Sequence, residues 1–215
     1  MARDDERMAR SQEEPIVGGL PDVPGIGVAM RLTPGLGIHL RGLADEVLVN
    51  DFPGATIQRH EREMLATAVS AANDCFFCMD SHAAHAGALL ERENATHLEP
   101  VLEQIKTGSS DGVSPKMAAL LDIARTVRRA PRQLTRADID AAHQAGASQG
   151  DVQLAVLIAS AFSMYNRLVD GFRARTAPGT DVYRERATQI ADHGYSAPPP
   201  TPDRPAAPGA APTTS

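Results

Sequence analysis

The amino-acid sequence predicts an all-α fold, and three observations support that prediction. Apolar residues recur every three or four positions in several segments, which is the spacing of one helix face. Residues that favour helix N-termini (Asp, Asn, Ser, Thr and Pro) stand before most of these segments. No segment shows the convincing alternation of apolar and polar residues that indicates a half-buried strand.

Three helices are expected in the first half of the chain. The first covers Leu40–Asn50, with apolar residues at helical spacing, and Asp51, Pro53 and Gly54 end it. The second covers Thr56–Ala72 and has a continuous apolar stripe: Ile57, Met64, Leu65, Ala68 and Val69. The third opens at Asn73 or Asp74, which are both good N-cap residues, and runs to about Arg92.

Three more helices are expected in the second half. One begins at Ser114-Pro115, with proline in the first helical position, and ends before Pro131. A short helix begins at Thr135 with a capped start and closes at Gly146. The last long helix begins at Ser148 and runs towards Phe172.

Composition divides the chain into one domain and two loose ends. We expect residues 1–23, charged and then punctuated by Gly and Pro, to be a flexible segment. Residues 196–215 are rich in Pro, Ala and Thr with almost nothing to bury, which predicts a disordered tail. The helical domain is therefore expected at residues 24–195.

Charge and hydropathy exclude several classes of protein. A formal net charge of −6 argues against a general nucleic-acid binder, which needs an excess of Lys and Arg. The longest apolar windows are judged too short to span a bilayer, so no membrane partner is expected. The N-terminus has acidic residues and no apolar core of a signal peptide, which predicts a cytoplasmic protein. In that reducing compartment, two cysteines three residues apart indicate redox or metal chemistry.

The cysteines and a histidine form the candidate site. On one helix Cys75, Cys78 and His82 lie on the same face, with the two sulfurs close enough for a disulfide. If Asn73 or Asp74 caps the helix, Cys75 falls in the first turn, where the helix dipole stabilises a thiolate. The charge of Asp74 raises a neighbouring thiol pKa, and we expect the dipole and His82 to outweigh it.

The other titratable residues are more ambiguous. Glu63 can reach His82 only if the chain breaks near Asn73-Asp74, because twelve residues of unbroken helix span about 18 Å. Taken alone, Glu63 is more simply a solvated carboxylate on a helix face. His85 lies one turn beyond His82 and is a less favoured member of the site. We expect three other histidines, which have no partner pattern, to lie on the surface: His60, His97 and His143.

The pattern Glu-x11-Cys-x2-Cys-x3-His, after an Ala-rich run, resembles the AhpD-like alkylhydroperoxidases of the carboxymuconolactone decarboxylase superfamily. The segment from Ala141 to Phe172 is similar to the second helical half of that superfamily, and Asn166–Gly171 particularly resembles its peroxidase-related branch. The resemblance covers about Leu40 to Phe172. It implies an all-helical bundle that assembles as a homo-oligomer, often a trimer or hexamer, and it favours a functional Glu63.

The resemblance also implies roles for individual residues. Cys78 would be the thiolate that attacks the peroxide, and Cys75 would donate a proton and then close the disulfide. His82 and Glu63 would form the relay that deprotonates Cys78. One residue departs from the family pattern, because Phe77 stands where well-studied members carry a histidine. That change puts half of the proton relay in doubt.

The sequence therefore predicts a hydroperoxide reductase that needs a dithiol electron donor, lipoyl-like or thioredoxin-like, and no metal, haem or flavin cofactor. A four-ligand zinc site is one alternative, made of Cys75, Cys78, His82 and either His85 or Glu63. A lactone decarboxylase is another, and the cysteine pair argues against it because that branch of the superfamily does not depend on one. A non-catalytic redox sensor or assembly protein is the third.

Overall fold

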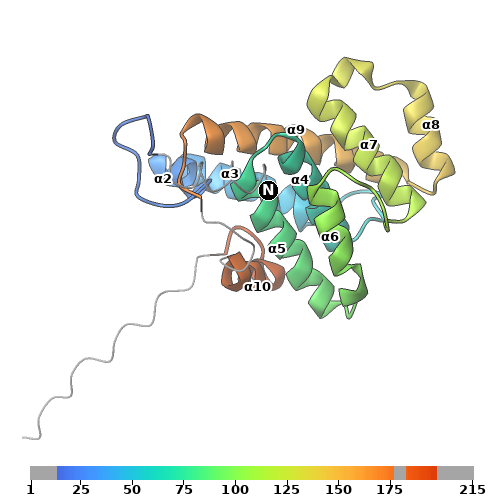
Figure 1. The fold of residues 1–215 in the computed structure, drawn as a ribbon, viewed down its shortest axis with the longest axis horizontal. Helices are drawn as coiled ribbons and strands as arrows, with labels where there is room; N and C mark the ends of the chain where they lie inside the picture. Colours follow the sequence, from blue (N-terminus) through green and yellow to red (C-terminus); the bar gives the residue numbers. More distant parts are fainter. Residues whose placement is uncertain (1–13, 177–182, 198–215) are drawn as a thin grey trace, which may run out of the picture.

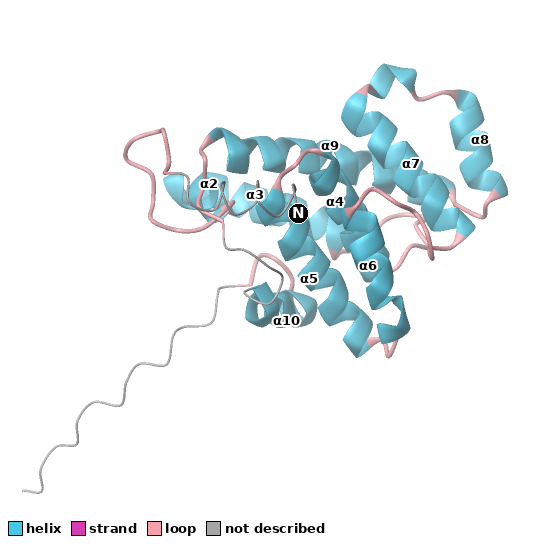
Figure 2. Ribbon diagram, in the orientation of Figure 1, coloured by secondary structure: helices cyan, strands magenta, loops and turns pink. Residues whose placement is uncertain are grey.

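The computed structural model describes residues 14–176 and 183–197, and the described residues form helices and loops with no strand (Figures 1 and 2). The prediction of an all-α fold is confirmed. Residues 198–215 of the expected tail and residues 1–13 of the expected flexible N-terminal segment lie outside the described residues. The helices, in chain order, are α2 Gly27–Leu32, α3 Pro34–Leu48, α4 Arg59–Ala72, α5 Phe76–Arg92, α6 Glu99–Lys106, α7 Pro115–Arg129, α8 Arg136–Gln144, α9 Gln149–Gly171 and α10 Arg184–His193, with short 3₁₀ turns at Thr96–Leu98 and Pro131–Gln133.

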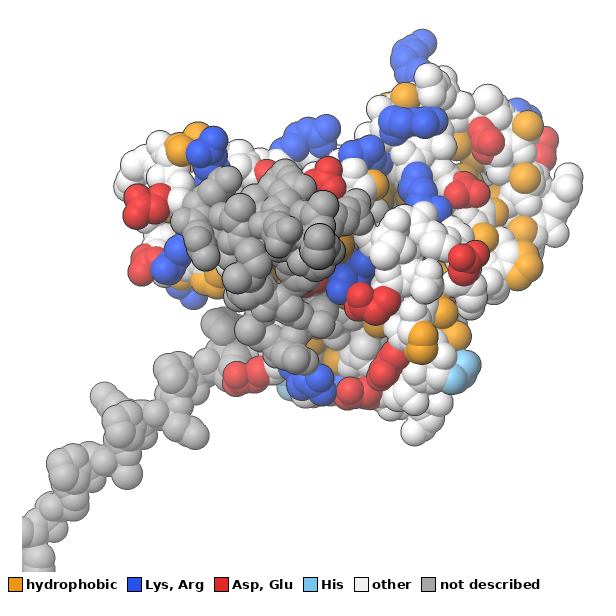
Figure 3. Space-filling view, in the orientation of Figure 1, with side chains coloured by type: hydrophobic (Ala, Val, Ile, Leu, Met, Phe, Trp, Pro, Cys, Tyr) orange, Lys and Arg blue, Asp and Glu red, His pale blue; other side chains and the backbone are white. Residues whose placement is uncertain are grey.

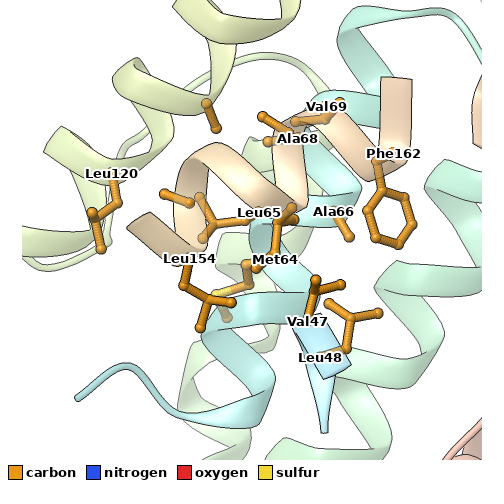
Figure 4. Packing of buried hydrophobic residues seen from close by; sticks show 14 of the residues in the cluster. Val47, Leu48, Met64, Leu65, Ala66, Ala68, Val69, Leu120, Leu154 and Phe162 are labelled. Carbon is orange, nitrogen blue, oxygen red and sulfur yellow. The ribbon is translucent and has the colours of Figure 1, made fainter. Parts of the chain in front are cut away.

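Helix α4 is the centre of the core. It contacts α3, α5, α6, α7 and α9, and from Met64 to Ala71 every residue is buried. A helix that is buried on all sides needs no polar face, which explains its Ala-rich sequence. Figure 4 shows Leu65 and Met64 of α4 beside apolar side chains from α3, α7 and α9: Val47, Leu48, Leu120, Leu154 and Phe162.

Three of the expected helix starts are confirmed by their caps. Ser114, Thr135 and Ser148 each accept a hydrogen bond from a backbone N–H in the first turn of the following helix. The side chain of Asp151 accepts in turn from the backbone N–H of Ser148, which completes a capping box. It also accepts from the backbone N–H groups of Thr56 and Ile57 at 2.5 and 2.9 Å. This carboxylate therefore ties the loop that precedes α4 to the start of α9.

The break between α4 and α5 is sharper than expected. Asp74 takes a left-handed backbone conformation with φ of 56°, and Cys75 N–H bonds to the carbonyl oxygen of Ser70. These features make a Schellman-type stop, in which a left-handed residue ends the helix. The expected cap at Asn73 or Asp74 is wrong: both residues belong to the end of α4, and Cys75 itself is the N-cap of α5.

Three described helices were not expected: α2, α6 and α10. Helix α2 has only six residues, and α10 buries only Ala187, Ile190 and Ala191 in an otherwise polar sequence. Neither pattern is long enough or apolar enough to predict a helix from periodicity. Helix α10 packs against α5, below it in the view of Figure 1, and so brings the end of the described chain to the cysteine helix.

The expectation that no apolar segment is long enough to span a bilayer is wrong for helix α9. Within the described residues it is long and apolar enough to cross a membrane, by length and composition alone. More than half of its most apolar window is buried inside the protein, as in the core helix of a globular domain. On the face seen in Figure 3, acidic and basic side chains are interspersed rather than gathered by sign.

Candidate functional site

The cysteine pair lies in a small apolar cluster at the start of α5. Cys75 and Cys78 are both buried, neither is in a disulfide, and they pack with Val28, Val169 and Ala174. A hydrogen bond between the two sulfurs, followed by burial and by the charge of Cys78, raises the pKa of the Cys75 thiol. The raised pKa of Cys75 argues against the expected thiolate at this residue, and its causes are the neighbouring Cys78 and burial in the apolar cluster.

The packing of α4 against α5 brings Glu63 to His82. The Glu63 carboxylate and Nδ1 of His82 are 2.6 Å apart, although the residues are 19 positions apart in sequence. Glu63 is only 1% exposed, so the solvated alternative for this residue is wrong. Burial raises the pKa of Glu63, but the neighbouring imidazoles of His82 and His85 outweigh it and hold the value at about 2. Glu63 is therefore ionised at neutral pH and accepts the Nδ1–H of His82.

Tyr195 is a site residue that the sequence did not reveal. Its hydroxyl donates to the second oxygen of Glu63 at 2.7 Å and lies 2.9 Å from Nδ1 of His85. Burial, followed by the charge of Glu63, raises the pKa of Tyr195, which keeps the phenol protonated. The backbone N–H groups of Tyr195 and Ser196 donate to the carboxylate of Asp45 at 2.6 and 3.0 Å, which fixes this segment against α3.

His85 completes a hydrogen-bonded network with these residues. Because the Tyr195 hydroxyl donates its proton to Glu63, its oxygen is free to accept from Nδ1–H of His85. Burial lowers the pKa of His85, so its ring is neutral at pH 7. In both imidazoles Nδ1 then carries the proton, and Nε2 is the free acceptor. The geometry therefore supports His85 as a member of the candidate site, although the sequence favoured it less than His82.

A cavity of about 460 Å³ opens beside this network. Cys78, Ser81, His82 and His85 line one wall of it, because positions three and four residues apart share a face of α5. The ring of Phe162 meets the ring of His82 edge to face, with centroids 4.5 Å apart, which holds that imidazole at the wall. Cys75 does not line the cavity.

Phe77 forms an apolar part of the cavity wall. Its ring lies so close to Gly25 that a Cβ atom at that glycine would come within 2.1 Å of it. It also meets the ring of Tyr183 edge to face at 5.5 Å. Phe77 is therefore packed between two segments, and it supplies no proton donor at this position.

Among the remaining histidines, His97 and His143 are exposed as expected. The expectation for His60 is wrong, since it is buried and lies 2.6 Å from the carboxylate of Glu93.

The described residues also include three potential metal ligands with donor atoms within 4.8 Å of one another: Glu63, His82 and His85. The cysteines are not part of that group, so it differs from the zinc site that the sequence left open as an alternative.

Comparison with known proteins finds a family model that matches part of the chain and two solved structures with the same fold. A model of the carboxymuconolactone decarboxylase family matches residues 44–126, which include Glu63, both cysteines, His82 and His85 but not Tyr195. A search of curated proteins found no match.

Two solved structures share the fold. One is an alkylhydroperoxidase AhpD core, an uncharacterized peroxidase-related protein from Ralstonia eutropha JMP134; it is 24% identical, with a TM-score of 0.62 over 77% of this chain and 82% of that one. The other is an uncharacterized peroxidase-related protein from Silicibacter sp. TM1040; it is 19% identical, with a TM-score of 0.60 over 80% of this chain and 93% of that one. The family model thus matches the part of the chain that holds Glu63, the two cysteines and both site histidines, and the two solved structures share its fold.

Proposed function

We propose that the protein is a thiol-dependent hydroperoxide reductase, with Cys78 as the peroxide-attacking residue. One observation carries the proposal: Cys78 lines the cavity beside His82, while Cys75 is buried behind it and hydrogen-bonded to it. The peroxidase-related names of the two solved structures support the same reaction class.

The reaction needs only the two thiols and an outside reductant. The Cys78 thiolate attacks the terminal peroxide oxygen, so that an S–O bond forms and the O–O bond breaks. The sulfur is oxidised to a sulfenic acid, and the peroxide is reduced to an alcohol once its leaving oxygen takes up a proton. The Cys75 sulfur then displaces the sulfenic oxygen as water, which forms the disulfide. An external dithiol reduces that disulfide by exchange.

The buried network supplies the proton transfers of the first step. His82 lies one helical turn beyond Cys78 and accepts a proton at Nε2 as Cys78 becomes a thiolate. The Glu63 carboxylate stabilises the positive charge on the ring, because it is ionised and bound at Nδ1. The same imidazolium then protonates the leaving oxygen.

The proposal extends to the surroundings of the enzyme. A dithiol-driven cycle requires a reducing compartment, so we place the protein in the cytoplasm with a lipoyl-like or thioredoxin-like donor. The resemblance to the superfamily supports a homo-oligomer of three or six chains. Size-exclusion chromatography with light scattering tests that assembly.

Thiol mapping tests the reaction itself. The reduced protein is treated with one equivalent of hydroperoxide, alkylated and digested, and its peptides are identified by mass spectrometry. We expect one intramolecular Cys75–Cys78 disulfide per chain. If both thiols remain free, or if only links between chains form, the proposed function is wrong.

A metal site is the second candidate, because Glu63, His82 and His85 bring three donor atoms within 4.8 Å of one another. Nitrogen and carboxylate donors of this kind suit zinc. Elemental analysis of protein purified without chelator tests it. One equivalent of zinc that is lost in Glu63→Gln would favour this candidate, and metal-free protein that still forms the disulfide would reject it.

A further inference from the structure

The cavity beside Cys78 is much larger than hydrogen peroxide requires. Its volume of about 460 Å³ is on the order of fifteen times the volume of one water molecule in the liquid. It falls in the range of pockets that bind organic molecules. Much of its lining is apolar, contributed by several elements: Ile26, Met30, Ala44, Phe77, Phe162 and Ile190. The cavity therefore suits a substrate with a hydrocarbon body.

Three arginines from three different helices also line the cavity. Arg31 lies at the end of α2, Arg41 in α3 and Arg186 in α10. No Asp or Glu is among the described residues that line it. This concentration of positive charge is opposite in sign to the protein as a whole, which has a formal net charge of −6.

The nearby acidic groups are already engaged. Both oxygens of the Asp45 carboxylate accept hydrogen bonds from the backbone of Tyr195 and Ser196. Glu63 lies behind the wall and is bound to His82 and Tyr195. Burial lowers the pKa of Arg186, and the charge of Arg41 lowers it further, whereas Tyr195 and Asp45 raise it. The two guanidinium groups that line the cavity therefore repel each other. An anion between them would relieve that repulsion.

We propose that this cavity takes organic hydroperoxides whose hydrocarbon body ends in a carboxylate. The hydroperoxide group lies at Cys78, and the carboxylate lies against Arg31, Arg41 and Arg186. Arginine suits this role because its guanidinium binds a carboxylate through two parallel hydrogen bonds. This specificity rests on the proposed reductase function, and the chemical step at Cys78 is the same.

A matched pair of substrates tests the carboxylate requirement. Hydroperoxydecanoic acid and its methyl ester differ only in the charge at the far end, and both are used below their micelle concentrations. We expect kcat/KM to be about tenfold higher for the acid, chiefly through a lower KM, since hydrogen bonds to charged groups are among the stronger ones. The preference should fall as salt is added, because the arginines are partly exposed.

Arginine variants test which side of the cavity recognises the charge. Arg41→Gln should reduce the acid-to-ester ratio towards one, and Arg31→Gln should reduce it in part. Arg136→Gln, an exposed arginine at the start of α8, is the control and should leave the ratio unchanged. Equal rates for acid and ester, or a ratio that Arg41→Gln does not change in folded protein, would overturn the proposal.

A binding measurement separates this inference from the reductase function. Decanoate and methyl decanoate carry no peroxide, so calorimetry with them reports on the cavity alone. We expect decanoate to bind about tenfold more tightly than the ester and less tightly to Arg41→Gln. A protein that binds decanoate in this way but reduces no hydroperoxide would refute the reductase function only. One that reduces cumene hydroperoxide and shows no preference for decanoate would refute the carboxylate inference only.

Discussion

Replacing Glu63 by glutamine tests the centre of the proposed relay. The substitution keeps the size of the side chain and removes its charge, in a position that is 1% exposed. The fall of the Glu63 pKa from 4.5 to about 2, with burial opposing the two imidazoles, corresponds to about 3 kcal/mol in favour of the ionised form in the folded protein. Glutamine retains part of the hydrogen bonding, so we expect Glu63→Gln to lower the free energy of unfolding at pH 7 by about 1–3 kcal/mol.

The pH dependence of that difference has a defined sign. A carboxyl group whose pKa is lower in the folded state stabilises the protein above its unfolded pKa, and the stabilisation is lost as pH falls through the folded value. The gap between parent and Glu63→Gln should therefore narrow from about pH 4.5 towards about pH 2. Asp151, whose pKa is also near 2, titrates in both proteins and does not affect the comparison. Urea unfolding at a series of pH values measures the gap.

The same substitution should slow the attack on peroxide. Without the carboxylate, the positive charge that forms on His82 is no longer stabilised, and general acid–base assistance of this kind is worth about a hundredfold. The rate of disulfide formation, followed by rapid alkylation, should fall by about that factor. Glu91→Gln, an exposed carboxylate on the same helix as His82, is the matched control and should react at the parent rate. If folded Glu63→Gln also reacts at the parent rate, the relay has been assigned wrongly.

Two further predictions address the cysteines and the tyrosine. Cys78→Ser should abolish peroxide consumption, whereas Cys75→Ser should leave a sulfenic acid on Cys78 that dimedone traps; an adduct on Cys75 in the active Cys78→Ser variant would reverse the roles. Tyr195→Phe removes the donor to Glu63, so it should shift the pH profile of disulfide formation while Tm falls by only a few degrees. An unchanged profile would reduce Tyr195 to a packing residue.

The sequence predicted the parts of the fold that local chemistry determines. Three predicted N-caps are confirmed: Ser114, Thr135 and Ser148. Each cap depends only on a hydrogen bond between its side-chain oxygen and the backbone N–H three residues later, so the local sequence is enough to predict it. The chain break between Glu63 and Cys75 was foreseen only as a possibility. Its cause is the left-handed Asp74, and Asn166 of α9 and Arg128 of α7 hold the turn through the side chain of Asn73.

The parts of the site that sequence reasoning missed depend on long-range contacts. Tyr195 reaches Glu63 across 132 positions, from a segment that follows a polar helix with few apolar residues. The partner of His60 is Glu93 in the segment after α5, and no pattern within either segment indicates that pair. A spacing rule detects residues on one helix, such as Cys78 and His82, but it cannot detect which helices pack together.

Because position 77 is a phenylalanine, the site has groups that transfer protons beside Cys78 but none at position 77 for Cys75. Three titratable residues that line the cavity, His82, His85 and Tyr195, belong to the Glu63 network. Phe77 faces Gly25 and Tyr183, so nothing at this position can take the proton of Cys75. The raised pKa of Cys75 makes that proton hard to lose. Attack by Cys78 is therefore assisted by the Glu63 network, whereas the side chain at position 77 gives closure of the disulfide no such help.

Phe77→His tests this conclusion. In the parent protein, closure should limit turnover, and a sulfenic acid on Cys78 should accumulate during a single turnover. The variant should close the disulfide faster, by up to about a hundredfold. The gain should be largest near neutral pH, where an imidazole is about half-charged. Loss of the ring packed on Gly25 will destabilise the variant by about 1–3 kcal/mol, so folding must be verified by circular dichroism before rates are compared. A folded variant that closes no faster at any pH would show that proton transfer at position 77 does not limit the enzyme, and the redox-sensor alternative would then gain support.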